Sequence, residues 1–323
     1  MVRRAAESSG SWRATSGERY YSLNRYLKER FGGRLAKIPL DAGFGCPNRD
    51  GSLGSGGCVF CGRRGSGTGA REKGLSISAQ IEAVRAYLSR RYKTDRFIAY
   101  FQAFSNTHGP VEALEQAYDQ ALAFDQVKVL AVGTRPDCLE KEKLDLLGRI
   151  NREREVWLEL GLQSAHDSTL KRINRGHDFQ AFRRAVEAAA GRGLKVFVHL
   201  ILGLPGEGFK EAAETVDLLR PLKLTGVKLH GLHVSTDAPL AQDYRAGRVR
   251  LLTLEEYAGM VAGLIGLMPP EWIIQRLTGD PYPQTLLGPV WMRDKPKVLA
   301  AIRDRLEELD IWQGRDLGSE CRK

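Results

Sequence analysis

The 323-residue chain lacks any apolar stretch near the roughly 20 residues that a membrane-spanning helix needs. Its most apolar run, from Val196 to Leu204, is short and contains His199. The arginines near the N-terminus are not followed by an apolar segment, so a secretory signal is not expected. We therefore expect a cytoplasmic protein without membrane segments, in which residues 1–17 form a disordered tail.

Cysteine is scarce, with five residues in the chain, which is an odd number. Three of them, Cys46, Cys58 and Cys61, lie close together, whereas Cys138 and Cys321 stand apart. This spacing does not fit the disulfide framework of a small secreted domain. A cluster of three cysteines instead indicates metal binding in a reducing compartment.

Acidic residues are fewer than basic ones, 39 against 49, which gives a formal net charge of +10. Such an excess suits a polyanionic partner such as nucleic acid, through phosphate contacts and counterion release. A basic protein with no such partner fits the charge equally well.

Six nearly continuous apolar runs alternate with amphipathic helical stretches. Such runs are typical of parallel strands that are covered on both faces. The six predicted strands are Leu35–Phe44, Phe97–Phe104, Val127–Thr134, Val156–Gln163, Val196–Leu204 and Val227–Val234. Right-handed β/α units form either an open sheet or a barrel. Because the motifs described below follow the strand ends, we expect an α/β fold with a partial (β/α)6 TIM-type barrel.

The pattern changes after residue 250. Leu254–Leu267 and Lys297–Leu309 are predicted helices, and Trp272–Leu277 is a possible extra strand. The segment Pro281–Pro289 is expected to be a loop. We therefore predict a core at residues 18–250, a helical C-terminal extension at 251–315 packed on the barrel, and a tail at 316–323.

The cysteine loop follows the first predicted strand. Eleven residues separate Cys46 from Cys58, and two separate Cys58 from Cys61. The intervening residues are rich in Gly, Asn, Asp and Ser, which suits a loop that wraps an inorganic cluster. Three thiolates leave one iron of a 4Fe-4S cluster open to bind S-adenosylmethionine. The alternative is structural zinc, which needs a fourth ligand such as His108.

The fourth predicted strand carries an unusual face. Glu159, Gly161 and Gln163 alternate with three leucines and so share one side of the strand. Buried polar groups need partners. A polar cofactor across the barrel mouth would supply them, and so would a hydrogen-bond network without a ligand.

Three further motifs give the chain a family resemblance. The segments Glu159–Ser164, Asn174–His177 and Gly203–Gly206 resemble radical S-adenosylmethionine (SAM) enzymes of the elongator catalytic subunit and oxygen-independent coproporphyrinogen oxidase type. Thr134–Asp137 is also similar to the elongator subunit. The chain most resembles the stand-alone YhcC/YtqA-like family, which shares the Cys-Pro-Asn-Arg-Asp-Gly loop and the segment Trp291–Lys295.

The resemblance implies a set of cofactor residues. Cys46, Cys58 and Cys61 would bind the cluster, and Gln163 and Arg175 would contact the ribose and carboxylate of SAM. The full set of implied SAM-binding residues is Ser105, Asn106, Thr107, Glu159, Gln163, Arg175, His199, Gly203, Leu204 and Pro205. Two positions depart from the pattern. His199 replaces an aspartate of coproporphyrinogen oxidase, and Gln102–Thr107 replaces a Gly-Gly-Glu type motif.

The resemblance also suggests a substrate. Together with the net charge, it implies modification of the tRNA wobble uridine, with a reductant such as flavodoxin or ferredoxin. A small-molecule or protein substrate is the alternative, and a non-catalytic zinc and nucleic-acid-binding module is a third. Residues that could contact substrate, or simply pack on the extension, are Lys228, His230, His233, Trp291 and Lys295. Nothing in the sequence indicates the oligomeric state.

Overall fold

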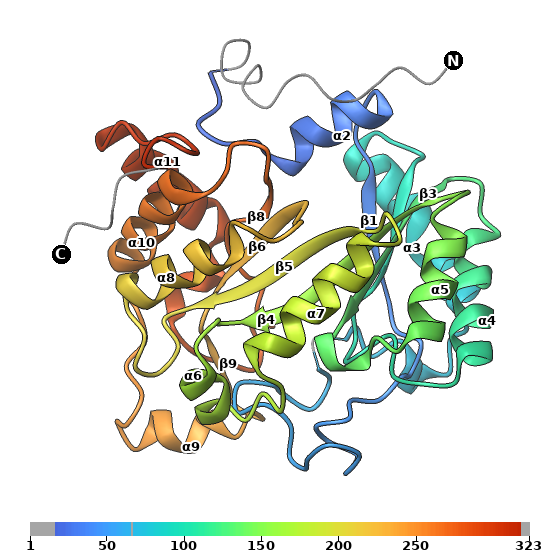
Figure 1. Cartoon of the computed structure of the whole chain (residues 1–323), viewed down its shortest axis with the longest axis horizontal. Coiled ribbons are helices and arrows are strands. Elements are labelled where there is room, and N and C mark those ends of the chain that lie inside the picture. Colours follow the sequence, from blue (N-terminus) through green and yellow to red (C-terminus); the bar gives the residue numbers. More distant parts are fainter. Residues whose placement is uncertain (1–16, 66, 318–323) are drawn as a thin grey trace.

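The computed structural model describes residues 17–65 and 67–317 of the chain. Its main sheet has seven strands in the order β1-β2-β3-β4-β5-β6-β8, and every neighbouring pair is parallel. The strands are β1 (Ala36–Leu40), β2 (Phe97–Phe101), β3 (Val127–Thr134), β4 (Glu155–Gln163), β5 (Lys195–Leu202), β6 (Gly226–Gly231) and β8 (Ile273–Arg276). The sheet curls into a half-barrel (Figure 1), so the predicted partial barrel is confirmed.

Helices connect the strands and cover the outer face of the sheet (Figure 1). They are α3 (Ile77–Tyr92), α4 (Val111–Leu122), α5 (Lys141–Ile150), α6 (Asp167–Arg172), α7 (Phe179–Ala190), α8 (Phe209–Leu219), α9 (Leu240–Arg245), α10 (Leu254–Leu267) and α11 (Lys295–Glu308). Short 3-10 segments occur at η1 (Arg71–Lys73), η2 (Pro136–Cys138) and η3 (Val290–Arg293). Asp294 caps α11 by accepting from the backbone N–H of Lys297.

The two faces of β4 have different roles, as the period of two predicts. Leu158, Leu160 and Leu162 join the core between the sheet and the outer helices. Glu159 and Gly161 face the barrel interior and line a cavity there. The buried leucines therefore hold the strand in place, and the opposite face is left for polar groups.

One end of the barrel is closed by helix α2 (Leu23–Phe31), which the sequence analysis did not predict. Ser22 caps the helix, and Leu27 is buried against a cluster that includes Trp157 and Phe197. The carbonyl of Tyr21 accepts a hydrogen bond from the N–H of Ile274 in β8, at 2.8 Å. The cavity therefore lies toward the other end, where the strands end and the cysteine loop begins (Figure 1).

The structure refines the predicted elements after β5. Trp272–Leu277 contains β8, which pairs with β6, so the segment assigned to the extension supplies the seventh strand. The predicted strand Val227–Val234 divides into β6 and β7 (Val234–Ser235). The expected loop Pro281–Pro289 contains β9 (Leu286–Gly288), which pairs antiparallel with β7. The predicted tails, 1–17 and 316–323, lie outside the described residues except for 17, 316 and 317.

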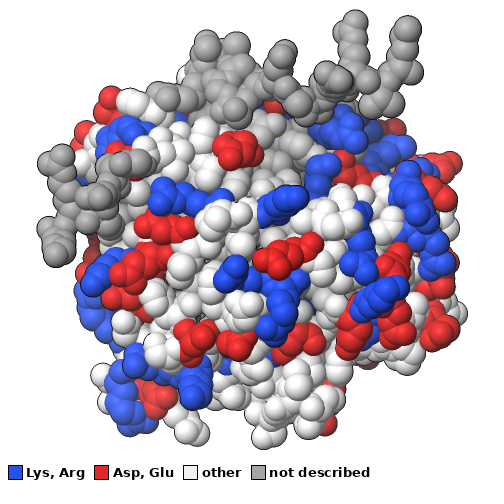
Figure 2. Space-filling view, viewed as in Figure 1, with Lys and Arg blue, Asp and Glu red and all other residues white. Residues whose placement is uncertain are grey.

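Among the described helices, none combines the length and apolar character required to cross a bilayer. On the face of the molecule in Figure 2, basic and acidic side chains are interspersed. The positive net charge therefore does not form a field of one sign on that face.

Candidate active site

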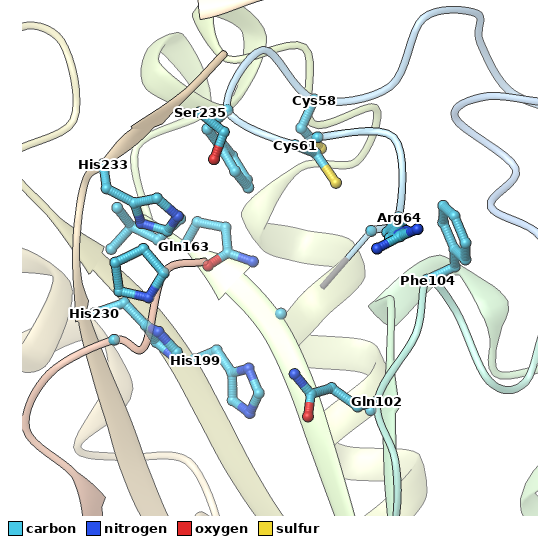
Figure 3. Close-up of a pocket in the computed structure, with 18 of the residues that line it drawn as sticks. Cys58, Cys61, Arg64, Gln102, Phe104, Gln163, His199, His230, His233 and Ser235 are labelled. Carbon is cyan, nitrogen blue, oxygen red and sulfur yellow. The ribbon is translucent and has the colours of Figure 1, made fainter. Parts of the chain in front are cut away.

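A cavity of about 820 Å³ opens at the C-terminal ends of the strands. This volume lies within the ~300–1,000 Å³ that is typical of small-molecule sites. Cys46, Cys58 and Cys61 all line it. Figure 3 shows Cys58 and Cys61 on one side of the space and His199, His230 and His233 along another.

Main-chain and side-chain bonds hold the cysteine loop against the rest of the rim. Asn174 donates through Nδ2 to the carbonyl of Gly57 at 2.7 Å. Arg49 donates to the carbonyls of Cys61 and Gly62 at 2.9 and 2.8 Å. Asn174 has a positive φ of 51°, which asparagine tolerates better than most residues. The loop between β1 and α3 is thereby fixed to the turn after α6.

Arg175 connects the loop to strand β4. Its Nη1 donates to the Sγ of Cys58 at 3.4 Å, and its Nη2 donates to the carbonyl of Gly161 at 2.5 Å. Any Cβ at residue 161 would lie 2.7 Å from that Nη2. Glycine is therefore required at this position for the guanidinium to reach the strand.

Gln163 enters the cavity because β4 ends in a bulge. The pairing of β4 with β5 shifts between Gly161 and Gln163, and Gln163 has a φ of 82°. Bulges re-aim a side chain at the end of a strand. Figure 3 shows the Gln163 side chain in the space below Cys58 and Cys61.

Two buried guanidinium groups at the cavity have hydrogen-bonding capacity to spare. Arg135 is 2% exposed and Arg175 is 7% exposed. Nη1 of Arg135 and Nε of Arg175 have no hydrogen-bond partner among the described residues. Buried donors of this kind require acceptors. Sulfides of an iron–sulfur cluster and the carboxylate of SAM are such acceptors, so the residues fit these groups.

The zinc alternative needs a fourth ligand, and His108 is occupied elsewhere. Its Nε2 lies 2.7 Å from Oδ2 of Asp50, on the outer side of the loop.

Below the cysteines, Glu159 is fully buried and bonded to protein side chains. Its Oε2 lies 2.8 Å from Nζ of Lys228 and 2.9 Å from Nε2 of His199. Its Oε1 accepts from Lys37 at 3.1 Å and from Gln275 at 3.0 Å. The hydrogen-bond network that we considered for this face of β4 is therefore present.

The network shifts the pKa values of its members. Burial opposes ionisation of Glu159, but Lys228 and Lys37 hold the pKa of its carboxyl well below the usual range. Burial lowers the pKa of Lys228 to about 7, with Glu159 opposing and Lys37 and Arg276 adding to the fall. Burial lowers the pKa of His199 to about 4. At neutral pH the imidazole is therefore neutral and the carboxylate ionised.

The structure brings seven of the predicted site residues to the cavity and leaves six away from its lining. The seven are Cys46, Cys58, Cys61, Glu159, Gln163, Arg175 and His199. The six are Ser105, Asn106 and Thr107, together with Gly203, Leu204 and Pro205.

The first of these two triplets lies behind the wall of the cavity. Ser105 and Thr107 bond the hydroxyl of Thr134 at 2.8 and 2.6 Å, and Asn106 donates to the carbonyl of Gly133 at 2.9 Å. Gln102, from the same predicted motif, lines the cavity instead.

The second triplet supports the rim. Gly203 has a φ of 81°, and Leu204 is buried in a small apolar cluster. The carbonyl of Pro205 accepts from Arg172 at 2.7 Å. Ile201, two residues before Gly203, is the β5 residue that reaches the cavity together with His199.

Three of the five candidate substrate residues, Lys228, His230 and His233, also line the cavity. Trp291 packs on Tyr257 and donates to the carbonyl of Leu252 at 2.9 Å, and Lys295 pairs with Asp280 at 3.0 Å. These two residues therefore pack on the extension.

Sequence reasoning gave no role to several cavity residues, among them Tyr100, Arg276 and Arg135, the last of which lies within the quoted segment Thr134–Asp137. Tyr100 and Gln102 are two residues apart at the end of an apolar run, and that alternation was the available signal for Tyr100.

A curled parallel sheet with a three-cysteine loop at its C-terminal edge is the architecture of radical SAM enzymes. The radical SAM superfamily profile matches residues 43–219, and the profile of the radical SAM C-terminal domain matches residues 224–308. Protein YhcC of Escherichia coli is 42% identical over 293 residues, covering 90% of this chain and 93% of its own. The chain belongs to the radical SAM superfamily and, within it, to the family that contains YhcC.

Two further proteins extend the comparison. The uncharacterized protein YtqA of Bacillus subtilis is 38% identical over 298 residues, which is 92% of each chain. The structure of Elp3 from the archaeon Methanocaldococcus infernus superposes with a TM-score of 0.66 at 16% identity, covering 86% of this chain and 64% of that one. This likeness shows a shared fold. The protein is therefore a radical SAM enzyme that uses a 4Fe-4S cluster and SAM.

Proposed function

We propose that this enzyme modifies the wobble uridine of tRNA, or its side chain, with Cys46, Cys58 and Cys61 as the ligands of the cluster. The observation that supports this proposal is that the three loop thiols line the same cavity as Arg135 and Arg175, whose guanidinium groups each have one N–H without a partner among the described residues. When bound, the cluster and SAM supply a 5′-deoxyadenosyl radical that abstracts hydrogen from substrate. Electrons would come from a carrier such as flavodoxin or ferredoxin.

The chain's own residues position and shield these groups. Arg175 donates to the Cys58 sulfur and keeps its Nε free for an anion, which suits the SAM carboxylate. Gln163 offers an amide to the ribose from its bulged position. Arg135 lies near Cys46 and Cys58 and adds positive charge to this side of the cavity.

tRNA as substrate is supported by the elongator-like motifs and by the net charge of +10. An anticodon loop offers unstacked bases, and enzymes that act on a base extrude it into a pocket. Arg49, Arg63 and Arg64 line the cavity on the cysteine-loop side. They suit the phosphates of a loop whose base has entered.

Two measurements test this function. Anaerobic reconstitution should give a brown protein with about four irons per chain, which releases 5′-deoxyadenosine when it is reduced. Nucleosides in tRNA from a deletion strain should differ from those of the parent strain at the wobble position. Unchanged nucleosides, together with intact SAM cleavage, would point to a small-molecule or protein substrate instead.

A further inference from the structure

One layer of the barrel interior carries basic side chains on three adjacent strands. His199 of β5 pairs in register with Lys228 of β6, and Lys228 pairs with Arg276 of β8. His230 lies two residues after Lys228 on the same face, with its ring 5.7 Å from that of His199. Burial lowers the pKa of His230 well below its usual value, so its imidazole is a neutral hydrogen-bonding group. We call Lys228, Arg276 and the neutral His230 the cationic floor, and all three line the cavity.

The charges around the floor do not balance. Lys37 and Lys228 share the single carboxylate of Glu159, at 3.1 and 2.8 Å. Arg276 pairs with Asp280, which is 53% exposed at the mouth and also bonds Lys295. Four cations thus face two carboxylates, and only one of these carboxylates is buried.

The floor also has donors to spare. The ammonium of Lys228 has three N–H groups, and it bonds Tyr100 at 3.0 Å and Glu159 at 2.8 Å. Nε2 of His230 is buried and has no hydrogen-bond partner among the described residues. Burial lowers the pKa of Lys228 to about 7, and the neighbouring cations lower it further, as expected where an anion is lacking.

We propose that the cationic floor binds a carboxylate carried by the part of the substrate that enters the barrel. This inference rests on the proposed function and names the substituent on the uridine. A flipped nucleotide enters base first, so its backbone phosphates stay at the mouth. The group that reaches Lys228 is therefore the substituent on the base, and it is acidic.

The test compares an acidic probe, 5-carboxymethyluridine, with its neutral methyl ester. Each is measured as the nucleoside and within an anticodon stem-loop RNA, by calorimetry on the reconstituted holoenzyme. The carboxylate should bind at least about tenfold more tightly than the ester, as expected for hydrogen bonds to a charged group. Lys228→Met should remove that preference.

Two controls keep the result specific. Lys210→Met removes the same charge from a lysine whose side chain is 78% exposed on α8, so it should leave the preference unchanged. The iron content and the far-UV circular dichroism of Lys228→Met show whether the variant is folded and holds its cluster, independently of any activity.

The possible failures are distinct. Equal binding of acid and ester, or a preference that survives Lys228→Met, overturns the inference and leaves tRNA modification standing. A preference that disappears when SAM is added also overturns it, because the floor would then hold the SAM carboxylate. A preference seen with the nucleoside but with no binding of the stem-loop supports the carboxylate site and counts against tRNA.

Discussion

Arg175 lies with its Nη1 3.4 Å from the Sγ of Cys58, so a residue of the turn after α6 contacts a predicted cluster ligand directly. The same guanidinium bonds the end of β4 through Gly161. A single side chain thus joins the cysteine loop, strand β4 and the turn between α6 and α7. The geometry gives the site several separable parts, and each can be tested by substitution.

Replacing any one of the three loop cysteines by alanine should abolish SAM cleavage. Two thiolates hold an open four-iron cluster poorly, so the iron content should fall well below about four per chain. Iron analysis and the 5′-deoxyadenosine assay measure both effects. Cys138→Ala is the matched control, because Cys138 is buried but does not line the cavity. Loss of iron in that control alone would contradict the assignment.

Replacing Arg175 by lysine should weaken SAM binding while the cluster is retained. Lysine keeps the charge but loses the planar fork that suits a carboxylate. A lost charged hydrogen bond corresponds to roughly 10- to 100-fold in affinity. Equilibrium dialysis of SAM with the reconstituted protein measures it. An unchanged Kd with full iron content would show that Arg175 does not hold the carboxylate.

Replacing Glu159 by glutamine should destabilise the fold strongly. The change leaves Lys37 and Lys228 buried without their shared carboxylate, and breaking a buried pair costs about 3–5 kcal/mol. Lys228→Met should lower the free energy of unfolding by less, because Glu159 still forms its ion pair with Lys37. Anaerobic urea unfolding compares the free energies of unfolding, and the reverse order would contradict the network.

The stability conferred by Lys228 should rise with pH above neutrality. Its folded pKa is about 7, against the ordinary lysine value of 10.5, so between these values the unfolded chain binds more protons. The free energy of unfolding of the wild type, measured relative to that of Lys228→Met, should therefore increase from pH 7 to 9. The limiting slope is about 1.4 kcal/mol per pH unit. Glu159 stays ionised and Tyr100 stays neutral across this range, because the pKa of Glu159 lies well below its usual value and that of Tyr100 lies well above. If the difference between the two free energies of unfolding does not change with pH, the pKa of Lys228 does not lie near 7.

Leu27→Ala should destabilise the protein although the residue is far from the cavity. Leu27 is 2% exposed under the barrel, and such truncations cost about 2–5 kcal/mol. Leu218→Ala on α8 is the control, because Leu218 is 45% exposed and its loss should have little effect. Thermal unfolding separates the two variants. Equal melting temperatures would mean that α2 does not contribute to the core.

The sequence predicts the barrel well because its signals are local. The alternation along the fourth strand grouped Glu159 with Gly161 and Gln163 on one face, and the helix Leu254–Leu267 was predicted with the bounds it has. Helix α2 was missed although the chain carries local signals for it, since Ser22 caps its start and Gly32 ends it in the left-handed conformation. Its packing against the inner face of the sheet is a long-range contact that only the structure shows.

The two triplets that stay out of the cavity show the same limit. Ser105, Asn106 and Thr107 follow the strand end in sequence, but the chain turns them toward Gly133 and Thr134. Arg276 was missed because β8 pairs with β6 across the intervening β7, α9 and α10, and that pairing leaves no pattern in the local sequence. Motif spacing records order along the chain and not which way a turn aims its side chains.

The bond between Tyr21 and Ile274 joins segments near opposite ends of the described chain. Closing so long a loop is slow, and contacts of high sequence separation form late in folding. During synthesis the cysteine loop therefore leaves the ribosome well before the last strand can dock. The three thiols pass through a period in which the wall formed by β6 and β8 is still missing. The order of synthesis thus gives the iron donor an opportunity to reach these thiols before the barrel is complete.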